Sequence, residues 1–317
     1  MTYVPQVCRY IPMVRKVNRE KPPRRAANSR LAVRATWAAT QALGVVAPRL
    51  SGRPASVLWF TPWRLPQSER SRQREREWLR GAEPFEAAGL RGFAAGDGPL
   101  VLLVHGWGGW ASRLGALVRP LVESGHRVVG IDLPAHGSSP GRRSNPFEMS
   151  EALLEAAGSL GPLRAVVAHS FGGIVSLLAM DRGLKPESAV YLAPALRAEQ
   201  IRTRFAELFR LPPRVMDALV RRINRQFGSD VWERLDGRRI AERLAARDLD
   251  LPVLILHDPE DRDARYSDAL AMSEILPAAR LRSMPGAGHH RIVVDEQAVT
   301  ATVEFVTGRG AAEGRSA

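Results

Sequence analysis

Residues 164–178 read RAVVAHSFGGIVSLL, and this stretch decides the fold. Its first part is an apolar run rich in β-branched residues, which is typical of a strand buried on both faces. The apolar residues that follow have the length of a helix, and Gly183 offers a suitable C-cap for it. Ser170 therefore lies where a buried strand passes into a helix.

Small residues flank Ser170, with Ala168 two positions before it and Gly172 two positions after it. A tight strand-to-helix turn has strained backbone angles and brings its neighbours close together, so it requires such residues. The turn raises the hydroxyl to the carboxyl ends of the strands, where ligands bind in open α/β sheets. We therefore predict that Ser170 is a nucleophile. The alternative is a buried turn serine.

Strands and helices alternate on both sides of this stretch. Apolar strands are expected at 100–106, 126–134, 188–196, 252–258 and 279–286, and helices at 113–124, 148–159, 267–276 and 295–306. Such alternation predicts an α/β fold with a mostly parallel central sheet flanked by helices.

Residues 197–249 break the alternation, with helical spacing, many charges and no strand. The segment is too long for a plain loop, so we expect an inserted helical cap. Its apolar residues either pack the cap on the core or line an acyl pocket. The core itself is expected to comprise residues 51–196 and 250–310.

Residues 1–50 are interpreted as a basic N-terminal arm with a helix at 31–46. That helix either packs on the body of the protein or touches a membrane surface beside the arm. Between the arm and the first buried strand, we expect an edge strand at 57–63, a charged helix at 67–80 and a second strand at 85–94.

The positive charge is confined to the N-terminal part of the chain. The net charge is +13, and residues 1–80 carry 17 Lys and Arg against 4 Asp and Glu, whereas the remaining residues carry 29 of each sign. Because no helix-turn-helix, zinc-finger or RNA-binding sequence accompanies the charge, we expect no nucleic-acid partner.

Cys8 is the single cysteine, so an intrachain disulfide is excluded and a reducing compartment is favoured. No run of 18 apolar residues occurs, and the N-terminus lacks the order of a signal peptide. We expect a cytoplasmic protein, with weak contact to a membrane surface through the basic arm as the peripheral alternative.

A serine hydroxyl needs a base to remove its proton, and that base needs a carboxylate to orient it. The base is expected in PGAGHHRIV after the last strand, as His289 or, alternatively, its neighbour His290. The carboxylate is expected in LILHDPEDRDAR after the fifth strand, where Asp261 fits best. Asp258 is the alternative, or else it caps the turn.

HGWGGW at residues 105–110 follows the first buried strand. A loop so rich in glycine can aim an N–H group at a developing oxyanion, and we expect Trp107 and Phe171 to supply the two N–H donors. The alternative is a plain connecting turn. Since no metal-ligand spacing and no phosphate-binding loop is present, no cofactor and no metal are expected.

The motifs HGWGG, IDLPAHGSS, AHSFGG, LILHDPEDR and GAGHH occur in this order along the chain. With them the sequence resembles an α/β-hydrolase fold enzyme from about Leu100 to Val306. The resemblance implies Ser170, Asp261 and His289 as nucleophile, acid and base. It also implies that His105 and His136 organise loops. Ala168 departs from the family pattern, which has glycine there.

These features lead us to expect a serine hydrolase that cleaves a carboxylic ester of a small acyl substrate through an acyl-enzyme on Ser170. A thioesterase or an acyltransferase of the same fold is an alternative, as is a non-catalytic member that binds a ligand, because the fold does not choose the substrate. The oligomeric state is left open.

Overall fold

The computed structural model describes residues 25–62, 67–247 and 251–308. Eight strands form one sheet in the order β1-β2-β4-β3-β5-β6-β7-β8. The last six strands in this order run parallel to one another, and β2 pairs antiparallel with β4 at one side. The strands are β1 (Glu83–Ala87), β2 (Leu90–Ala95), β3 (Leu100–Val104), β4 (Arg127–Asp132), β5 (Leu163–His169), β6 (Ala189–Leu192), β7 (Val253–His257) and β8 (Ala279–Ser283).

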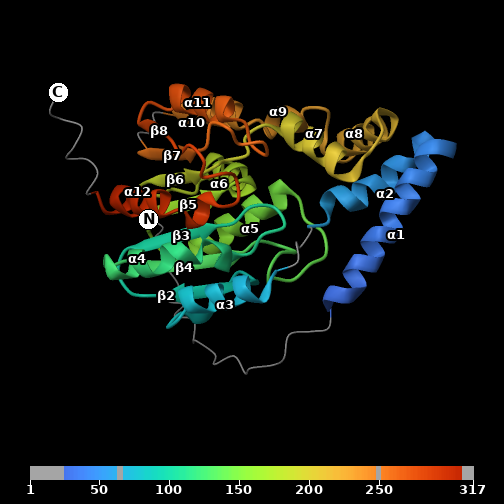
Figure 1. The fold of residues 1–317 in the computed structure, drawn as a ribbon. Helices are drawn as coiled ribbons and strands as arrows, with labels where there is room; N and C mark the ends of the chain where they lie inside the picture. The colour runs from blue at the N-terminus through green and yellow to red at the C-terminus, as the bar shows by residue number, and fades with distance from the viewer. Residues whose placement is uncertain (1–24, 63–66, 248–250, 309–317) are drawn as a thin grey trace, which may run out of the picture.

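Helices cover both faces of this sheet (Figure 1). One face packs against α5 (Pro146–Gly158), α6 (Phe171–Asp181), α10 (Gly237–Ala245) and α11 (Tyr266–Ile275). The other packs against the 3-10 helices η1 (Ala111–Leu117) and η2 (Ile292–Val294), with α4 (Val118–Glu123) and α12 (Glu296–Thr307). The predicted α/β class is confirmed.

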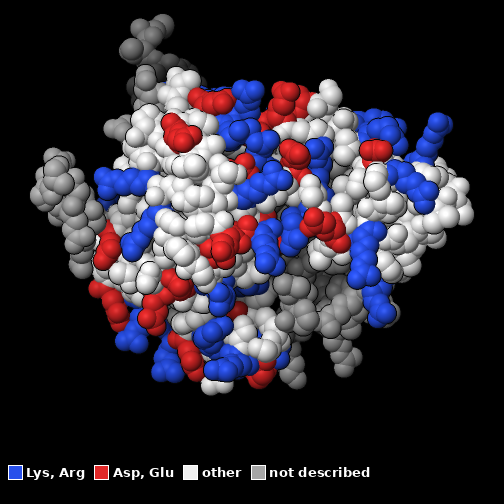
Figure 2. Space-filling view, turned by 45° about the horizontal axis from the view of Figure 1, so that its top comes forward, with Lys and Arg blue, Asp and Glu red and all other residues white. Residues whose placement is uncertain are grey.

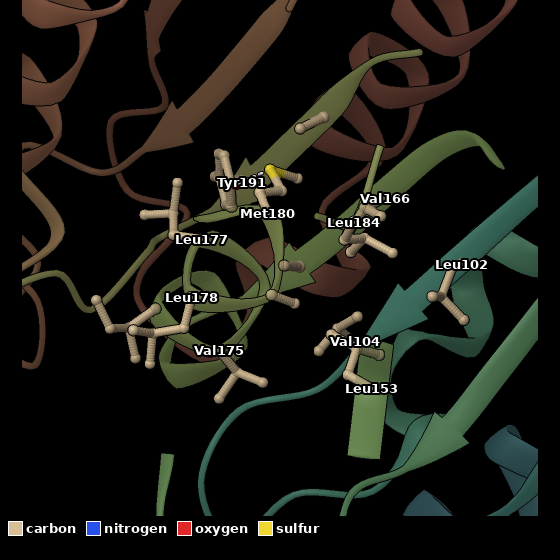
Figure 3. Close-up of a cluster of buried hydrophobic side chains, with 14 of the residues drawn as sticks. Leu102, Val104, Leu153, Val166, Val175, Leu177, Leu178, Met180, Leu184 and Tyr191 are labelled. Atoms are coloured by element: carbon tan, nitrogen blue, oxygen red, sulfur yellow. Dashed lines mark hydrogen bonds between the residues drawn. The ribbon is translucent and has the colours of Figure 1, made fainter. Parts of the chain in front are cut away.

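Strand β3 shows why the sheet needs both layers. All five of its residues are buried, and alternate side chains enter opposite cores. Leu102 and Val104 join the cluster around α5 and α6, which Figure 3 shows in close-up, whereas Val101 and Leu103 join the cluster around η1 and α12. A strand buried on two faces has no polar alternation, which is why its sequence is a continuous apolar run.

The prediction of an edge strand at 57–63 was wrong. Val57 to Phe60 are the last turn of a helix, α2 (Pro48–Phe60), and Trp63 lies outside the described residues. The run was too short for its period to distinguish a strand from a buried helix. Leu58 is almost fully buried there, in a third cluster formed with α7 (Ala198–Phe209) and α8 (Pro213–Phe227).

The strand expected at 85–94 is a hairpin of two strands, β1 and β2. Ala88 and Gly89 join them, and both residues have positive φ, of 48° and 74°. Two successive residues with positive φ are typical of the tight turns that match the twist of a hairpin. The expected charged helix is α3 (Glu69–Trp78).

The segment expected as a cap contains α7 (Ala198–Phe209), α8 (Pro213–Phe227), α9 (Val231–Arg234) and α10, and no strand among its described residues. Its apolar residues pack in two separate clusters. Phe205, Phe209, Val215 and Leu219 pack with α2, whereas α10 lies in the core layer beside α6.

Helices α1 (Arg25–Val46) and α2 form an antiparallel pair that contacts the cap (Figure 1). The expected helix at 31–46 therefore begins earlier, and the expected division at residue 51 falls inside α2. The rest of the expected arm, residues 1–24, lies outside the described residues.

Gly52 allows α2 to approach α8 closely, and this contact can be tested. A Cβ atom at Gly52 would lie 2.5 Å from the carbonyl oxygen of Ala218 on α8. We predict that Gly52→Ala lowers the free energy of unfolding by about 1–3 kcal/mol, because a backbone atom cannot yield as a side chain does.

Gly158 is the matched control, since it also lies in a helix and a Cβ there would meet nothing within 4 Å. Gly158→Ala is expected to leave stability unchanged or to raise it by up to about 1 kcal/mol. Urea denaturation of both variants measures this, and equal stabilities would contradict the close packing of α2 on α8.

Candidate active site

Ser170 lies in a strained turn between β5 and α6. Its backbone has φ 52° and ψ −120°, which is unusual for a residue with a side chain. Gly172 makes the turn possible, because a Cβ atom there would lie 2.6 Å from the carbonyl oxygen of Val104 and 2.7 Å from that of His105. Strain of this kind persists only where the surrounding structure enforces it, and it is common in functional sites.

Ala168, the departure from the family pattern, causes no disruption of this turn. Its methyl group is fully buried in the cluster around α6, and the residue pairs regularly with Val104 on β3 and Tyr191 on β6. The sheet therefore accommodates one methyl group where the usual glycine has none.

The structure brings Ser170, His289 and Asp261 into one chain of hydrogen bonds. Ser170 Oγ lies 2.8 Å from His289 Nε2, and His289 Nδ1 lies 2.7 Å from Asp261 Oδ2. A carboxylate can only accept, so His289 donates its Nδ1 proton to Asp261 and presents a bare Nε2 to the serine hydroxyl. This is the tautomer that a general base for Ser170 requires.

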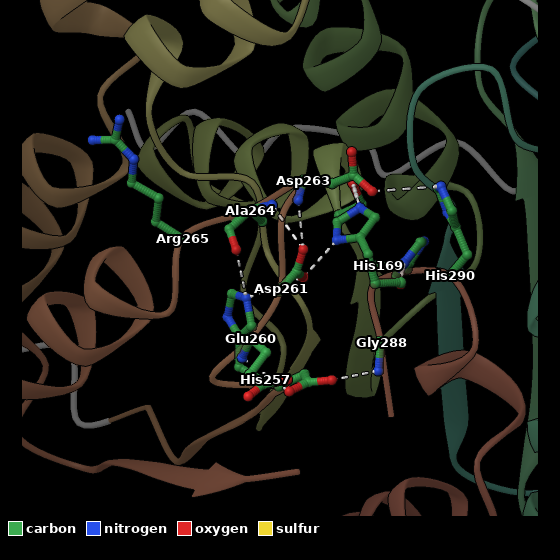
Figure 4. Close-up of polar contacts among 12 residues, drawn as sticks. His169, His257, Glu260, Asp261, Asp263, Ala264, Arg265, Gly288 and His290 are labelled. Atoms are coloured by element: carbon green, nitrogen blue, oxygen red, sulfur yellow. Dashed lines mark hydrogen bonds and ion pairs between the residues drawn. The ribbon is translucent and has the colours of Figure 1, made fainter. Parts of the chain in front are cut away.

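Asp261 is held by more groups than His289 alone (Figure 4). Its Oδ1 accepts hydrogen bonds from the backbone N–H groups of Asp263, at 2.7 Å, and Ala264, at 3.0 Å. Burial by itself would raise the pKa of Asp261, but hydrogen bonds from His257 and His289 and the Ala264 N–H outweigh it and hold that pKa below its usual range. The side chain therefore stays ionised while fully buried.

His257 is a contact of this acid that the sequence reasoning missed. Its Nε2 lies 3.3 Å from Asp261 Oδ2 and 3.1 Å from the carbonyl oxygen of Ala264, and the side chain is fully buried. Both neighbours are acceptors, so Nε2 carries the proton. The signal in the sequence was a histidine at the end of β7, four residues before the acid.

The two alternatives for acid and base lie elsewhere. Asp258 accepts from the N–H of Glu260, at 3.0 Å, and from that of Gly288, at 2.7 Å, so it caps its own turn and straps down the loop that carries His289. His290 points away from Ser170, with Nε2 3.8 Å from Asp263 and more than half of its side chain exposed.

His169 supports His289 from the other side. Its Nε2 donates to the carbonyl oxygen of His289 over 2.9 Å, and the two rings lie 5.2 Å apart. Burial first, and the neighbouring His289 second, hold the pKa of His169 well below its usual range. The ring is therefore neutral and acts as a fixed donor. The position of His169 next to Ser170 in the sequence did not by itself predict this role.

The loop after β3 passes directly over Ser170. A Cβ atom at Gly106 would lie 2.9 Å from the Cβ of Ser170, and the rings of Trp107 and Phe171 lie 5.3 Å apart. Phe171 is the first residue of α6, so its N–H has no acceptor within the helix. The two residues expected to donate to an oxyanion thus lie side by side next to Ser170.

His105 and His136 organise loops, as expected. His105 Nδ1 donates to the carbonyl oxygen of Gly106 over 2.7 Å, and its Nε2 accepts from the N–H of Leu133 at 3.0 Å. His136 Nδ1 lies 2.9 Å from the carbonyl oxygen of Pro134. In the described part of the chain, no group of three or more His, Cys, Asp or Glu side chains is placed to hold a metal ion.

The lowered pKa of Asp261 predicts how stability depends on pH. An unfolded Asp has a pKa of about 3.9, so the stabilising contacts of the ionised form are complete above that value and are lost as pH falls below it. We predict that wild type is more stable than Asp261→Asn at neutral pH and that this difference shrinks below about pH 4. Denaturant unfolding at a series of pH values measures it. A difference independent of pH would show that the ionised carboxylate does not stabilise the fold.

Known proteins that are similar to the chain identify its family. Residues 101–305 match the model of the alpha/beta hydrolase family. The probable esterase PIR7A of Oryza sativa subsp. indica is 35% identical over 103 residues, which are 31% of this chain and 39% of that protein. The polyneuridine aldehyde esterase of Rauvolfia serpentina is 40% identical over 88 residues, 25% of this chain and 32% of that protein. The chain thus spans less than two fifths of the length of these relatives.

Two solved structures share the fold. The monoacylglycerol lipase of Paleococcus ferrophilus superposes with a TM-score of 0.54 and 25% identity over 69% of this chain and 98% of that one. An esterase of Pyrococcus furiosus superposes with a TM-score of 0.59 and 16% identity over 78% of this chain and 97% of that one. The matched motifs, the sheet order and the family model agree: the chain belongs to the alpha/beta hydrolase family.

Proposed function

We propose that this protein is a serine hydrolase that cleaves a carboxylic ester through an acyl-enzyme on Ser170. The observation that supports it most directly is the hydrogen-bonded chain from Ser170 through His289 to Asp261, with distances of 2.8 and 2.7 Å. A nucleophile, a base and an orienting acid within reach of one another are the requirement for acyl transfer.

In the first step, Ser170 Oγ attacks the acyl carbon while His289 Nε2 takes the hydroxyl proton. The carbonyl oxygen of the ester becomes an oxyanion, which the N–H groups of Trp107 and Phe171 stabilise. Asp261 stays ionised and stabilises the imidazolium. His289 then passes its proton to the departing alcohol, and the acyl group remains on Ser170.

In the second step, water takes the place of the alcohol. His289 removes a proton from the water, whose oxygen attacks the acyl carbon and forms a second oxyanion. That intermediate collapses, the C–O bond to Ser170 breaks, and His289 returns the proton to Oγ. The carboxylic acid leaves and the enzyme is regenerated, so no cofactor takes part in the balance.

An ester is favoured over other acyl compounds by the two sequence relatives described above, both of which carry the name esterase. Acyl transfer is the second candidate, because a stretch of 109 residues is 36% identical to the dihydrolipoyllysine-residue acetyltransferase component of an acetoin cleaving system from Pseudomonas putida. The same acyl-enzyme serves both reactions, and they differ only in whether water or another nucleophile accepts the acyl group. Thioester cleavage would proceed through the same acyl-enzyme.

Hydrolysis of p-nitrophenyl esters and of acyl thioesters of increasing chain length tests the proposal. Wild type is expected to hydrolyse part of the ester series, and Ser170→Ala to lose on the order of 10⁴ or more in kcat, because the three residues act as a unit. Ser176→Ala is the matched control, since Ser176 lies in α6 and its hydroxyl donates to the carbonyl oxygen of Gly173, outside the hydrogen-bonded chain of Ser170, His289 and Asp261.

Retained activity in Ser170→Ala would overturn the proposal. Absence of hydrolysis of any ester or thioester by wild type would favour a member that only binds a ligand. Addition of an alcohol acceptor separates hydrolysis from transfer, since a transferase would form the new ester in place of the free acid.

The assignment of the acid has a test of its own. We predict that Asp261→Asn lowers kcat by about 10³–10⁴, because the imidazole loses the partner that fixes its tautomer. Asp258→Asn is expected to cost much less, since Asp258 accepts from the backbone N–H groups of Glu260 and Gly288 and does not hydrogen-bond to the ring of His289. A larger loss in Asp258→Asn than in Asp261→Asn would reverse the assignment.

A further inference from the structure

Exposed hydrophobic side chains are concentrated at one end of the molecule. Among the residues whose side chains are described, six large hydrophobic residues are exposed, and five of these lie on α1, at the start of α2 or at the end of α7. They are Trp37, Val45, Val46, Leu50 and Leu208. Single exposed apolar residues are ordinary, but a group of them indicates a surface that binds something.

The contacts of α1 connect these residues. Trp37 Nε1 donates to the carbonyl oxygen of Phe209 at the end of α7 over 2.9 Å, and Leu208 is the neighbour of Phe209. Val45 and Val46 end α1, and Leu50 follows in the first turn of α2, with each of the three between 65 and 79% exposed. We call these five residues the apolar patch.

Arginines surround the apolar patch and outnumber the exposed acidic residues of the adjoining cap, Glu207 and Asp217. Residues 25–60, which form α1 and α2, contain five Arg and neither Asp nor Glu. Arg34, Arg49 and Arg53 are exposed there, and Arg210 and Arg214 are exposed on the adjoining part of the cap. At the end of the molecule formed by α1, α2 and α8, Figure 2 shows several blue side chains around a white tip.

We propose that the apolar patch and its arginines dock on the surface of a bilayer that contains anionic phospholipids. Aliphatic side chains at a corner enter the boundary between headgroups and acyl chains, and arginines around them pair with lipid phosphates. No helix in the described part of the chain is long and apolar enough to span a bilayer. The contact is therefore a peripheral one.

The chemistry of the patch favours a bilayer over two other occupants. A second copy of the chain would bring the same arginines against each other, and like charges oppose that contact. Single-stranded nucleic acid is bound by basic grooves that carry aromatic side chains for base stacking, whereas four of the five patch residues are aliphatic. A negatively charged surface with an apolar interior pairs with the arginines and also accommodates the apolar patch.

Docking at the patch would also place the cap next to the bilayer. α7 connects the patch to the loop of the acid, because Arg204 Nη2 lies 2.6 Å from Asp263 Oδ1 and the N–H of Arg265 donates to Gln200 Oε1 over 3.1 Å. The docking itself needs neither Ser170 nor catalysis, so its test is independent of the proposed hydrolysis.

Flotation of the full chain with vesicles tests the proposal, using phosphatidylcholine alone and phosphatidylcholine mixed with phosphatidylglycerol. We expect binding to the mixed vesicles, little binding to the neutral ones, and weakening as salt is raised. Leu50→Glu is expected to weaken partition about tenfold or more, and Arg49→Glu about fivefold to tenfold.

Matched controls lie at other places on the surface. Leu270 on α11 is the sixth exposed hydrophobic residue, and Arg280 on β8 is an exposed arginine far from α1 in Figure 1. Leu270→Glu and Arg280→Glu should bind vesicles as wild type does. Circular dichroism and a cooperative urea unfolding transition verify that every variant is folded.

Three results would overturn the proposal. The first is that wild type fails to float with the anionic vesicles, and the second is that Leu50→Glu floats as well as wild type. The third is that light scattering finds a dimer which Leu50→Glu converts to a monomer, since a second copy would then cover the patch.

Discussion

The strained backbone of Ser170, with its positive φ, is the constraint on which the rest of the site depends. It exists because Gly172 lets α6 begin directly beneath the carbonyl oxygens of Val104 and His105, with no room for a Cβ atom. The turn sets Oγ at the carboxyl edge of the parallel strands. That position determines the path of the loop after β3 and how far His289 must reach. It also determines where a developing oxyanion would meet two N–H groups.

Buried histidines form a supporting layer around Asp261 and His289. His257 contacts Asp261, and His169 holds the backbone of His289, so the proposed acid and the proposed base are each fixed by a second ring. Asp258 also holds the loop that carries His289, because it accepts a hydrogen bond from the N–H of Gly288. Side chains whose rotamers are fixed in this way keep a catalytic geometry to a fraction of an ångström, which loops alone do not.

The sequence predicted those features that local pattern determines. Strands that are buried on both faces, such as β3, are continuous apolar runs. The stretch around Ser170 fits no simple arrangement other than a strand followed by a helix. The helix α2 was not predictable, because its apolar end is decided by tertiary contact with α8, and Leu58 reads equally well as strand or helix. The supporting roles of His257 and His169 were hidden for the same reason: each depends on residues distant in sequence, and a lone buried histidine has no distinctive pattern.

The central claim is that Ser170 becomes covalently acylated with the help of His289. Treatment of the native protein with a fluorophosphonate, followed by mass spectrometry of its peptides, tests this most directly. The account predicts a single adduct on the peptide that contains Ser170, and a strongly slowed reaction in His289→Ala, because the hydroxyl then lacks its base. An unlabelled native protein, or an adduct on another residue with Ser170 unmodified, would contradict it.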